Sequence, residues 1–85
     1  MTKAEILSIL NPENERLDYL AYDKYLVKLS NNLQIVGAFA IESVLSSSTE
    51  NIWKFRLTPN PMNLRFEGQD SITLNGEDIV VLKRL

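Results

Sequence analysis

The segment from Tyr25 to Ile41 constrains the fold of this chain more than any other part of its sequence. Apolar side chains recur at every second position on both sides of a polar turn at residues 30–32, which is the signature of two paired strands. Gly37 interrupts the second strand, and a glycine there marks a sharp bend or a close backbone approach. The segment therefore predicts a bent hairpin of the kind that a small, strongly curved barrel needs.

The composition predicts one small domain that associates with copies of itself. The chain has 85 residues, of which 45% are hydrophobic and none is cysteine. A domain of this size buries a limited share of its unfolded surface, and without cysteine no disulfide or thiolate-bound metal can brace it. Oligomerisation is the remaining common way for so small a domain to gain stability. We therefore expect a single domain over residues 1–85 that forms a homo-oligomer.

Net charge and hydropathy favour a cytoplasmic protein. The net charge is −2, which argues against a wide, non-specific nucleic-acid footprint because such footprints need an excess of lysine and arginine. No apolar run approaches the ~20 residues of a membrane-spanning helix. The first residues lack the basic and apolar regions of a signal peptide. We expect a cytoplasmic location and no contact with a membrane.

A short amphipathic helix is predicted over residues 2–10. Thr2 and Glu5 have the spacing of a capping box, and apolar residues recur at spacings of three and four. The helix ends before Pro12, because the residue preceding a proline is disfavoured in helical conformation. A helix this short must pack on the rest of the fold, and we expect it at the open end of a barrel. Residues 12–24 fit a helical face or a strand, with a helical turn favoured at their start.

Beyond the hairpin, the apolar pattern predicts three more strands. In the clearest of them Trp53 and Phe55 alternate with basic residues, which places the aromatic pair on the core face. Asn75 and Gly76 predict a turn, because both residues tolerate positive φ. The expected elements are a continuation of the second strand over 41–45, a turn over 46–51, strands over 52–58, 71–74 and 79–82, and an extended stretch over 62–67.

The last of these strands also predicts an interface. Residues 79–82 are apolar at every position, a pattern typical of a strand that is buried on both faces. A chain of this length can hardly cover the second face from within, so the pattern indicates a neighbouring subunit. One helix followed by five strands with short turns predicts a mainly β fold, a small five-stranded SH3-like barrel with an N-terminal α-helix.

The two glycine-containing segments, in this order, resemble the two motifs of the Sm family, which includes Sm-like (LSm) proteins and bacterial Hfq. The first motif is a strand, a polar turn and a second strand that carries a glycine. It is matched here by Val27, Leu29, Leu33, Ile35, Gly37, Phe39 and Ile41. The second motif is an apolar-Arg-Gly sequence followed by an apolar strand. It is matched by Ile72, Leu74, Asn75, Gly76, Ile79, Val81 and Leu82, with asparagine in the arginine position.

The resemblance implies a ring of about five to seven subunits. In the family, the fourth strand of one subunit pairs with the fifth strand of the next, which agrees with the interface indicated by the closing strand. The family also implies that the ring binds single-stranded RNA, U- or A-rich. The implied interface residues are Ile72, Leu74, Ile79, Val80, Val81 and Leu82.

The resemblance also implies where RNA binds. In the family, an acidic residue and a Met-Asn pair in the loop after the second strand bind a uridine, and the arginine of the second motif contributes to the same site. At or near the matching positions this chain has Ser43, Ser47, Asn51, Asn75 and Gly76, which are the candidate RNA-binding residues. The sequence Met62-Asn63-Leu64 contains the Met-Asn pair of the family, but it lies far beyond the loop after the second strand. We take this match as a coincidence.

The sequence does not predict an enzyme. It contains no histidine to shuttle protons and no cysteine nucleophile. No glycine-rich phosphate loop follows a strand, and no carboxylates have the spacing of metal ligands, so we expect neither a cofactor nor a metal. The alternative to RNA binding is a barrel that serves only as an assembly or structural subunit through protein–protein contacts, because SH3-like barrels serve many tasks.

Overall fold

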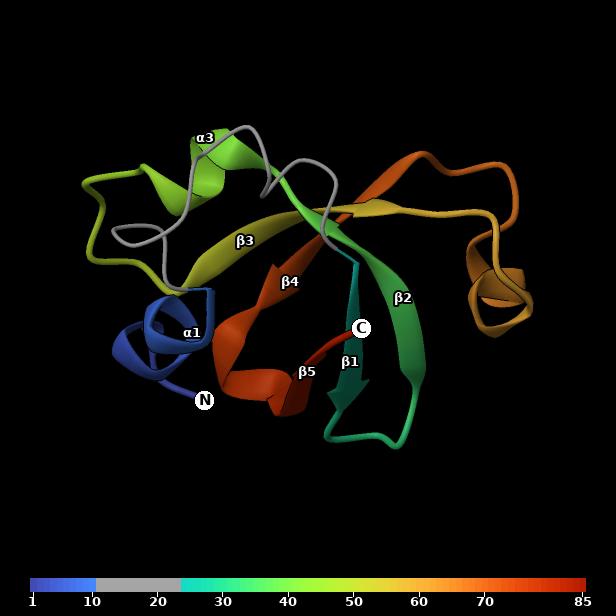
Figure 1. The fold of residues 1–85 in the computed structure, drawn as a ribbon, viewed down its shortest axis with the longest axis horizontal. Helices are drawn as coiled ribbons and strands as arrows, with labels where there is room; N and C mark the ends of the chain where they lie inside the picture. The colour runs from blue at the N-terminus through green and yellow to red at the C-terminus, as the bar shows by residue number, and fades with distance from the viewer. Residues whose placement is uncertain (11–23) are drawn as a thin grey trace.

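The structure is a computed structural model that describes residues 1–10 and 24–85 of the chain (Figure 1). The helical turn considered after Pro12 lies outside the described residues. The elements in chain order are helix α1 (Lys3–Leu10), strands β1 (Tyr25–Leu29) and β2 (Gln34–Phe39), the short helix α3 (Ile41–Val44), strand β3 (Ile52–Leu57), the 3₁₀ helix η1 (Pro61–Phe66), strand β4 (Ser71–Asn75), the 3₁₀ helix η2 (Gly76–Asp78) and strand β5 (Ile79–Arg84).

The five strands form one antiparallel sheet in the order β4-β3-β2-β1-β5. The predicted hairpin is confirmed as β1 and β2, with Tyr25 opposite Gly37 and Lys28 opposite Gln34. The mainly β class, the five strands and the N-terminal helix are confirmed as well. The sheet is open: in the part of the chain that the structure describes, β4 and β5 form its two edges. Figure 1 shows the strong curvature of the sheet along β2.

Of the two alternatives for Gly37, a sharp bend or a close backbone approach, the structure shows the close approach. Gly37 lies opposite Leu57 in the pairing of β2 with β3. A Cβ atom added to Gly37 would overlap the carbonyl oxygen of Arg56 and the ring of Phe55. Glycine is therefore needed here because the neighbouring strand leaves no room for a side chain.

Gly37→Ala is expected to lower the free energy of unfolding by about 1–3 kcal/mol or more, because the overlap forces the backbones of β2 and β3 apart. Urea denaturation checks this result. Gly68→Ala is the comparison, since Gly68 has φ +87° but no atom within 4 Å of the added Cβ, and its cost is the conformational strain of about 1–2 kcal/mol alone. A smaller loss at Gly37 than at Gly68 would contradict the close approach.

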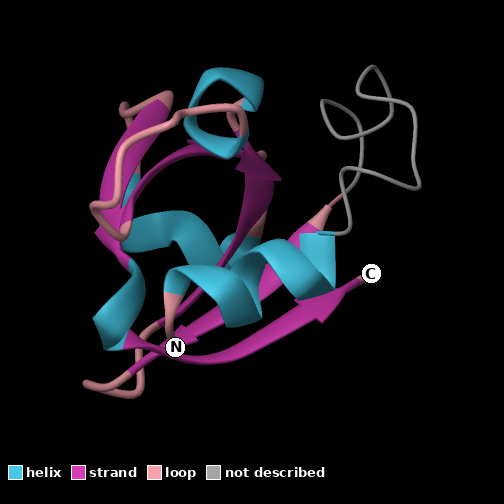
Figure 2. Cartoon of the chain, turned by 90° about the vertical axis from the view of Figure 1, so that its left-hand side faces the viewer, coloured by secondary structure: helices cyan, strands magenta, loops and turns pink. Residues whose placement is uncertain are grey.

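Helix α1 begins with the predicted capping box. The amide of Thr2 donates to Glu5 Oε1 at 2.9 Å, and the amide of Glu5 donates to Thr2 Oγ1 at 3.1 Å. The hydrogen bond from the Thr2 amide is the main cause that lowers the pKa of the Glu5 carboxyl. The helix buries Ile6 and Leu10 against the core. Figure 2, viewed from the side on which α1 lies, shows the helix in front of the strands.

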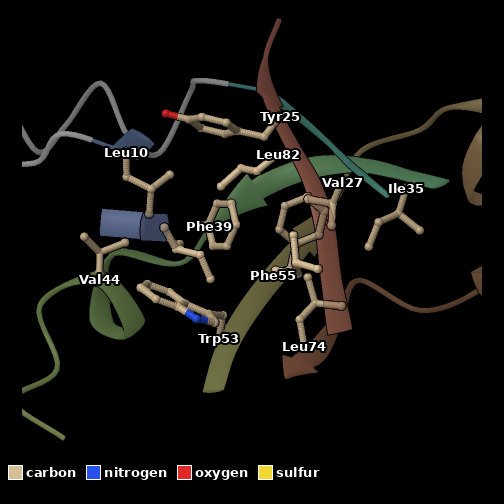
Figure 3. Packing of buried hydrophobic residues seen from close by; sticks show 12 residues of the cluster. Leu10, Tyr25, Val27, Ile35, Phe39, Val44, Trp53, Phe55, Leu74 and Leu82 are labelled. Carbon is tan, nitrogen blue, oxygen red and sulfur yellow. The ribbon is translucent and has the colours of Figure 1, made fainter. Parts of the chain in front are cut away.

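The core is built around the ring of Phe39. Its centroid lies 5.6 Å from Tyr25, 5.6 Å from Trp53 and 5.1 Å from Phe55, each in an edge-to-face arrangement, which is a favourable geometry for aromatic pairs. Trp53 and Phe55 are both buried, as the alternation in their strand predicts. Figure 3 shows Phe39 at the centre of the labelled side chains, with aliphatic residues from the helix and strands around it.

The predicted continuation of the second strand over residues 41–45 is wrong. The pairing of β2 with β3 extends as far as the hydrogen bond from the Ala40 amide to the Lys54 carbonyl oxygen, and the chain then turns into α3. The next amide of β3, that of Lys54, donates to Ser43 Oγ at 2.8 Å. A serine side chain from α3 thus takes the place that a longer strand would have filled.

The extended stretch predicted over residues 62–67 is also wrong, because these residues belong to η1. The side chain of Asn60 accepts a hydrogen bond from the Met62 amide at 2.9 Å, and Pro61 occupies the first helical position. An asparagine cap followed by proline is a helix start. The sequence Asn60-Pro61 therefore begins a helix here rather than only ending the strand before it.

Candidate nucleic-acid interface

Three of the five candidate RNA-binding residues come together where the loop before β3 meets the turn between β4 and β5. The Gly76 amide donates to the Asn51 carbonyl oxygen at 2.7 Å. Asn75 lies opposite Ile52 in the pairing of β3 with β4. In Figure 1 this end of the sheet lies on the left, beside α1. We call the cluster of Asn51, Asn75 and Gly76 the loop end of the sheet.

The side chain of Asn51 ties together three parts of the chain at the loop end. Its Oδ1 accepts a hydrogen bond from Trp53 Nε1 at 2.7 Å, and its Nδ2 donates to the Met1 carbonyl oxygen at 2.7 Å. Each of these atoms can still make one further hydrogen bond. Asn51 is half-buried, so a ligand at the loop end would meet an amide that is already held in a fixed orientation.

The turn predicted at Asn75-Gly76 is present as η2, but Gly76 is required there by space and not by a positive φ. Asn75 has φ −87°, and Gly76 is not among the described residues with positive φ. A Cβ atom on Gly76 would overlap the side-chain amide of Asn51. The absence of a side chain at Gly76 therefore allows Asn51 to pack against the turn.

The turn is further held by the first residue of the structure. The Met1 ammonium group donates hydrogen bonds to the carbonyl oxygens of Gly76 and Ile79, both at 2.8 Å. Together with the bond between Asn51 and the Met1 carbonyl oxygen, these contacts join the start of α1 to both loops. The loop end is thus a connected polar structure rather than two independent loops.

Asn75 presents the most accessible amide of the cluster. Its Oδ1 accepts a hydrogen bond from the Glu77 amide at 3.0 Å and so caps η2. The residue is exposed, and no bond from its Nδ2 group occurs within the described residues. This group can therefore donate to the acceptor atoms of an unstacked base.

The two candidate serines differ in their surroundings. Ser43 accepts the amide of Lys54 and so holds α3 against β3. Ser47 is exposed in the loop that follows α3. The Lys3 ammonium group donates to the carbonyl oxygens of Ser46 and Ser48 on either side of it. Lys3 therefore brings this loop to the start of α1, whereas Ser43 acts in the fold itself.

The surface around the loop end carries charges of both signs. A shallow depression of about 430 Å³ is lined by Met1, Thr2, Lys3, Glu5, Thr49, Asn51 and Glu77. The lowered pKa of Glu5 keeps its carboxylate ionised down to lower pH than usual. Lys54 on β3 forms an ion pair with Glu42 on α3, with 3.9 Å between Lys54 Nζ and Glu42 Oε1. Contacts with bases through amides and backbone groups fit this mixed surface better than broad attraction to phosphates does.

The six implied interface residues fall into two groups. Leu74, Ile79 and Leu82 are buried in the core of the chain itself, and Ile72 packs partly against it. Val80 and Val81 are 52% and 43% exposed on the edge strand β5. The pairing of β5 with β1 shifts register at this point, since Lys28 lies opposite Val81 and Leu29 opposite Ile79. With this bulge, Ile79 and Leu82 are both buried, and the two valines between them are exposed.

Asn63 is a buried polar residue that the sequence analysis set aside. It is 7% exposed, and its side chain satisfies the backbone of β2. Oδ1 accepts from the Val36 amide at 2.9 Å, and Nδ2 donates to the carbonyl oxygens of Val36 at 2.8 Å and Thr58 at 2.6 Å. The side-chain amide of Asn63 thus pairs with both backbone groups of Val36, as a residue of a neighbouring strand would. The helix-start signal of Asn60-Pro61 could have placed Asn63 in a turn, but nothing local indicates its burial.

Residues 1–10 and 24–85 contain no group of three side chains of the kinds that bind metals close enough together to hold an ion. None of the helices in these ranges has the length and apolar character needed to cross a membrane.

Comparison of the chain with models of protein families finds no match. Neither a curated protein nor a solved structure matches it.

Proposed function

We propose that this chain is an Sm-like protein that assembles into a homo-oligomeric ring and binds single-stranded RNA, U- or A-rich, at the loop end. The observation that carries the proposal is the convergence of Asn51 with Asn75 and Gly76. Asn75 and Gly76 belong to the second segment that resembles an Sm motif, and Asn51 lies in the loop between the two segments. The curved sheet then corresponds to an SH3-like barrel, with α1 at one end.

The ring is supported by the edges of the sheet. Strands β4 and β5 lie at opposite edges, and an open edge offers unpaired backbone groups to another chain. Pairing β4 of one copy with β5 of the next is a head-to-tail contact, which closes into a ring when the rotation between copies permits. The exposed side chains of Val80 and Val81 would gain burial in this contact. A ring of about five to seven subunits agrees with the family.

The RNA site is supported by the kinds of polar groups at the loop end. Single-stranded RNA is recognised through hydrogen bonds to unstacked bases and through stacking. The exposed Nδ2 of Asn75 and the oriented amide of Asn51 supply such hydrogen bonds. Lys3 supplies a positive charge beside the loop of Ser47. In a ring, one such cluster from each subunit would contact successive nucleotides.

Light scattering after gel filtration tests the ring. We expect a mass about five to seven times that of one chain. Val81→Lys places a charge on the exposed edge of β5 and is expected to shift the protein toward monomers. Lys24→Gln, an exposed change at the opposite end of β1 from the bulge, is the control. A strict monomer at all concentrations would contradict the ring.

Titration with oligo-U and oligo-A at low and moderate salt tests RNA binding. Ser47→Glu adds a negative charge at the loop end and is expected to weaken binding severalfold at low salt and less at high salt. Gln69→Glu adds the same charge at an exposed position between η1 and β4 and should leave binding unchanged. Absence of binding at about 10 μM, where even non-specific contacts of basic proteins register, would sink the RNA proposal.

The second candidate function is a protein-assembly subunit that does not bind RNA. It is favoured by the exposed Met62 and Leu64 on η1, the latter 69% exposed, and by the net charge of −2. On this reading, Leu64→Glu would abolish binding to a protein partner, whereas the ring would show no affinity for either oligonucleotide.

A further inference from the structure

A second polar concavity lies between the β1–β2 turn and η1. It has a volume of about 350 Å³ and is lined by Asn31, Asn32, Leu33, Gln34, Met62 and Arg65. The β1–β2 turn precedes β2, whereas α3 and its loop follow this strand. The β1–β2 turn also contacts η2, because the Ser30 amide donates to the Asp78 carbonyl oxygen at 2.8 Å. We call this concavity the turn pocket.

The turn pocket contains three amide side chains with unused hydrogen-bonding groups. Asn31 Oδ1 accepts from the Leu33 amide at 3.0 Å, which fixes the turn and leaves the Asn31 amino group available. The side chains of Asn32 and Gln34 make no hydrogen bond within the described residues and are exposed. Asn32 has φ +68°, a conformation that asparagine tolerates better than most residues do. The chain thus presents three amides around one hollow.

The charges around the turn pocket favour an anion. Arg65 is exposed and forms no ion pair with the described residues, and no carboxylate lines the pocket. Lys28 lies opposite Gln34 in the pairing of β1 with β2, so both side chains project from the same face of the sheet. This face is opposite to the one on which Val27 and Ile35 enter the core. Arg65 therefore lines the pocket, and Lys28 lies beside Gln34 on the same face of the sheet.

We propose that the turn pocket binds a nucleotide, with its phosphate on Arg65 and its base among the three amides. Guanidinium groups pair well with phosphate oxygens. Amide side chains both donate and accept hydrogen bonds, which matches the mixed edge of a base. Met62 is 49% exposed and supplies an adaptable apolar contact for the face of the base. The nucleotide can be a free mononucleotide or one unit of a single strand.

Calorimetric titration with the four mononucleotides, the matching nucleosides and inorganic phosphate tests the proposal. We expect at least one mononucleotide to bind more tightly than both its nucleoside and phosphate. Arg65→Gln should weaken nucleotide binding at least about tenfold, the loss expected for a charge-assisted contact. Lys24→Gln removes the same charge at the far end of β1 and should change affinity less than about twofold.

Nuclear magnetic resonance of the intact protein supplies a readout at the pocket. The side-chain amide signals of Asn31, Asn32 and Gln34 should shift on addition of the mononucleotide, whereas those of Asn51 and Asn75 should not. No shift up to about 10 mM nucleotide would overturn the proposal, and so would a nucleoside that binds as tightly as its nucleotide. A tetranucleotide that binds more tightly than the mononucleotide through Arg65 identifies a strand as the source, and equal affinities identify a free nucleotide.

The turn pocket does not depend on the function proposed for the loop end. Ser47→Glu reports on the loop end and Arg65→Gln on the turn pocket. Loss of RNA binding only in the Ser47 variant, with nucleotide binding retained, would support the loop end without altering the result at the pocket.

Discussion

Phe39→Ala is expected to lower the free energy of unfolding by about 3–5 kcal/mol, which is the range for deleting a buried phenylalanine ring. Phe39 is fully buried and makes edge-to-face contacts with three other aromatic rings. Deleting it removes the shared partner of Tyr25, Trp53 and Phe55 and leaves a cavity at the centre of the core. A domain of 85 residues has a total stability of only about 4–13 kcal/mol. The variant is therefore expected to be largely unfolded under mild conditions.

Urea denaturation, followed by the fluorescence of Trp53, measures the loss in the free energy of unfolding of the Phe39→Ala variant. Phe39→Leu fills most of the same volume and is expected to cost less, about 1.5–3 kcal/mol, since it removes the aromatic pairs but leaves a smaller cavity. Phe66→Ala deletes the same ring at a half-buried position on η1 and should cost less than the change at Phe39. Equal losses at Phe66 and Phe39 would show that Phe39 is not the centre of the core.

Asn63→Ala is expected to lower the free energy of unfolding by about 2–4 kcal/mol. The substitution removes three hydrogen bonds and leaves the amide and carbonyl groups of Val36 without their side-chain partner. A buried backbone group that loses its partner costs about 1–3 kcal/mol. The Val36 carbonyl oxygen keeps a 3.2 Å contact with the Thr58 amide, so its loss is partial, whereas the Val36 amide loses its only partner on the described chain.

Asn60→Ala is the matched control, because it deletes the same amide three residues earlier. Asn60 caps η1 through the exposed amide of Met62, which water can hydrate when the cap is lost, so we expect a cost of about 1 kcal/mol. Thermal unfolding of the two variants side by side measures the difference. Hydrogen exchange should be faster at the Val36 amide in the Asn63 variant and unchanged there in the Asn60 variant. A loss at Asn63 no larger than that at Asn60 would contradict the role of Asn63 in β2.

The parts of the fold that were correct from sequence depend on neighbours close in the chain. The capping box of Thr2 and Glu5 needs a spacing of three residues. The β1–β2 hairpin needs only alternation around a polar turn. The aromatic core face of β3 likewise follows from period-two alternation, because Trp53 and Phe55 point the same way in any extended strand.

Apart from η1, whose start at Asn60-Pro61 is a local signal, the differences arise where a distant residue competes with the local pattern. Residues 41–45 alternate well enough for a strand, but Ser43 bonds the Lys54 amide and the chain turns into α3. Asn63 lies 27 residues from Val36 in the sequence, so its spacing carries no information about their contact. Residues 79–82 are all apolar, and the bulge against β1 allows Ile79 and Leu82 both to enter the core while Val80 and Val81 stay exposed.

The candidate site likewise has a part that the sequence predicted and a part that only the tertiary structure shows. Motif spacing selected Asn75 and Gly76, and Asn51 was a candidate from the preceding loop. Their contact is created by the antiparallel pairing of β3 with β4. The turn pocket could not be foreseen at all, because Arg65 and Gln34 belong to segments with no shared pattern.

The sequence by itself determined the strand-rich class, the hairpin, the N-terminal cap and the aromatic residues of the core, because these depend on periodicity and short-range hydrogen bonds. The tertiary structure alone decided the strand order with β4 and β5 at the edges, the helical turn α3, and which neighbouring atoms require a glycine at positions 37 and 76. Gly37 and Gly76 look alike in the sequence, yet one makes room for the Arg56 backbone and the other for the Asn51 side chain. Such requirements come from atoms distant in the chain, and local pattern does not record them.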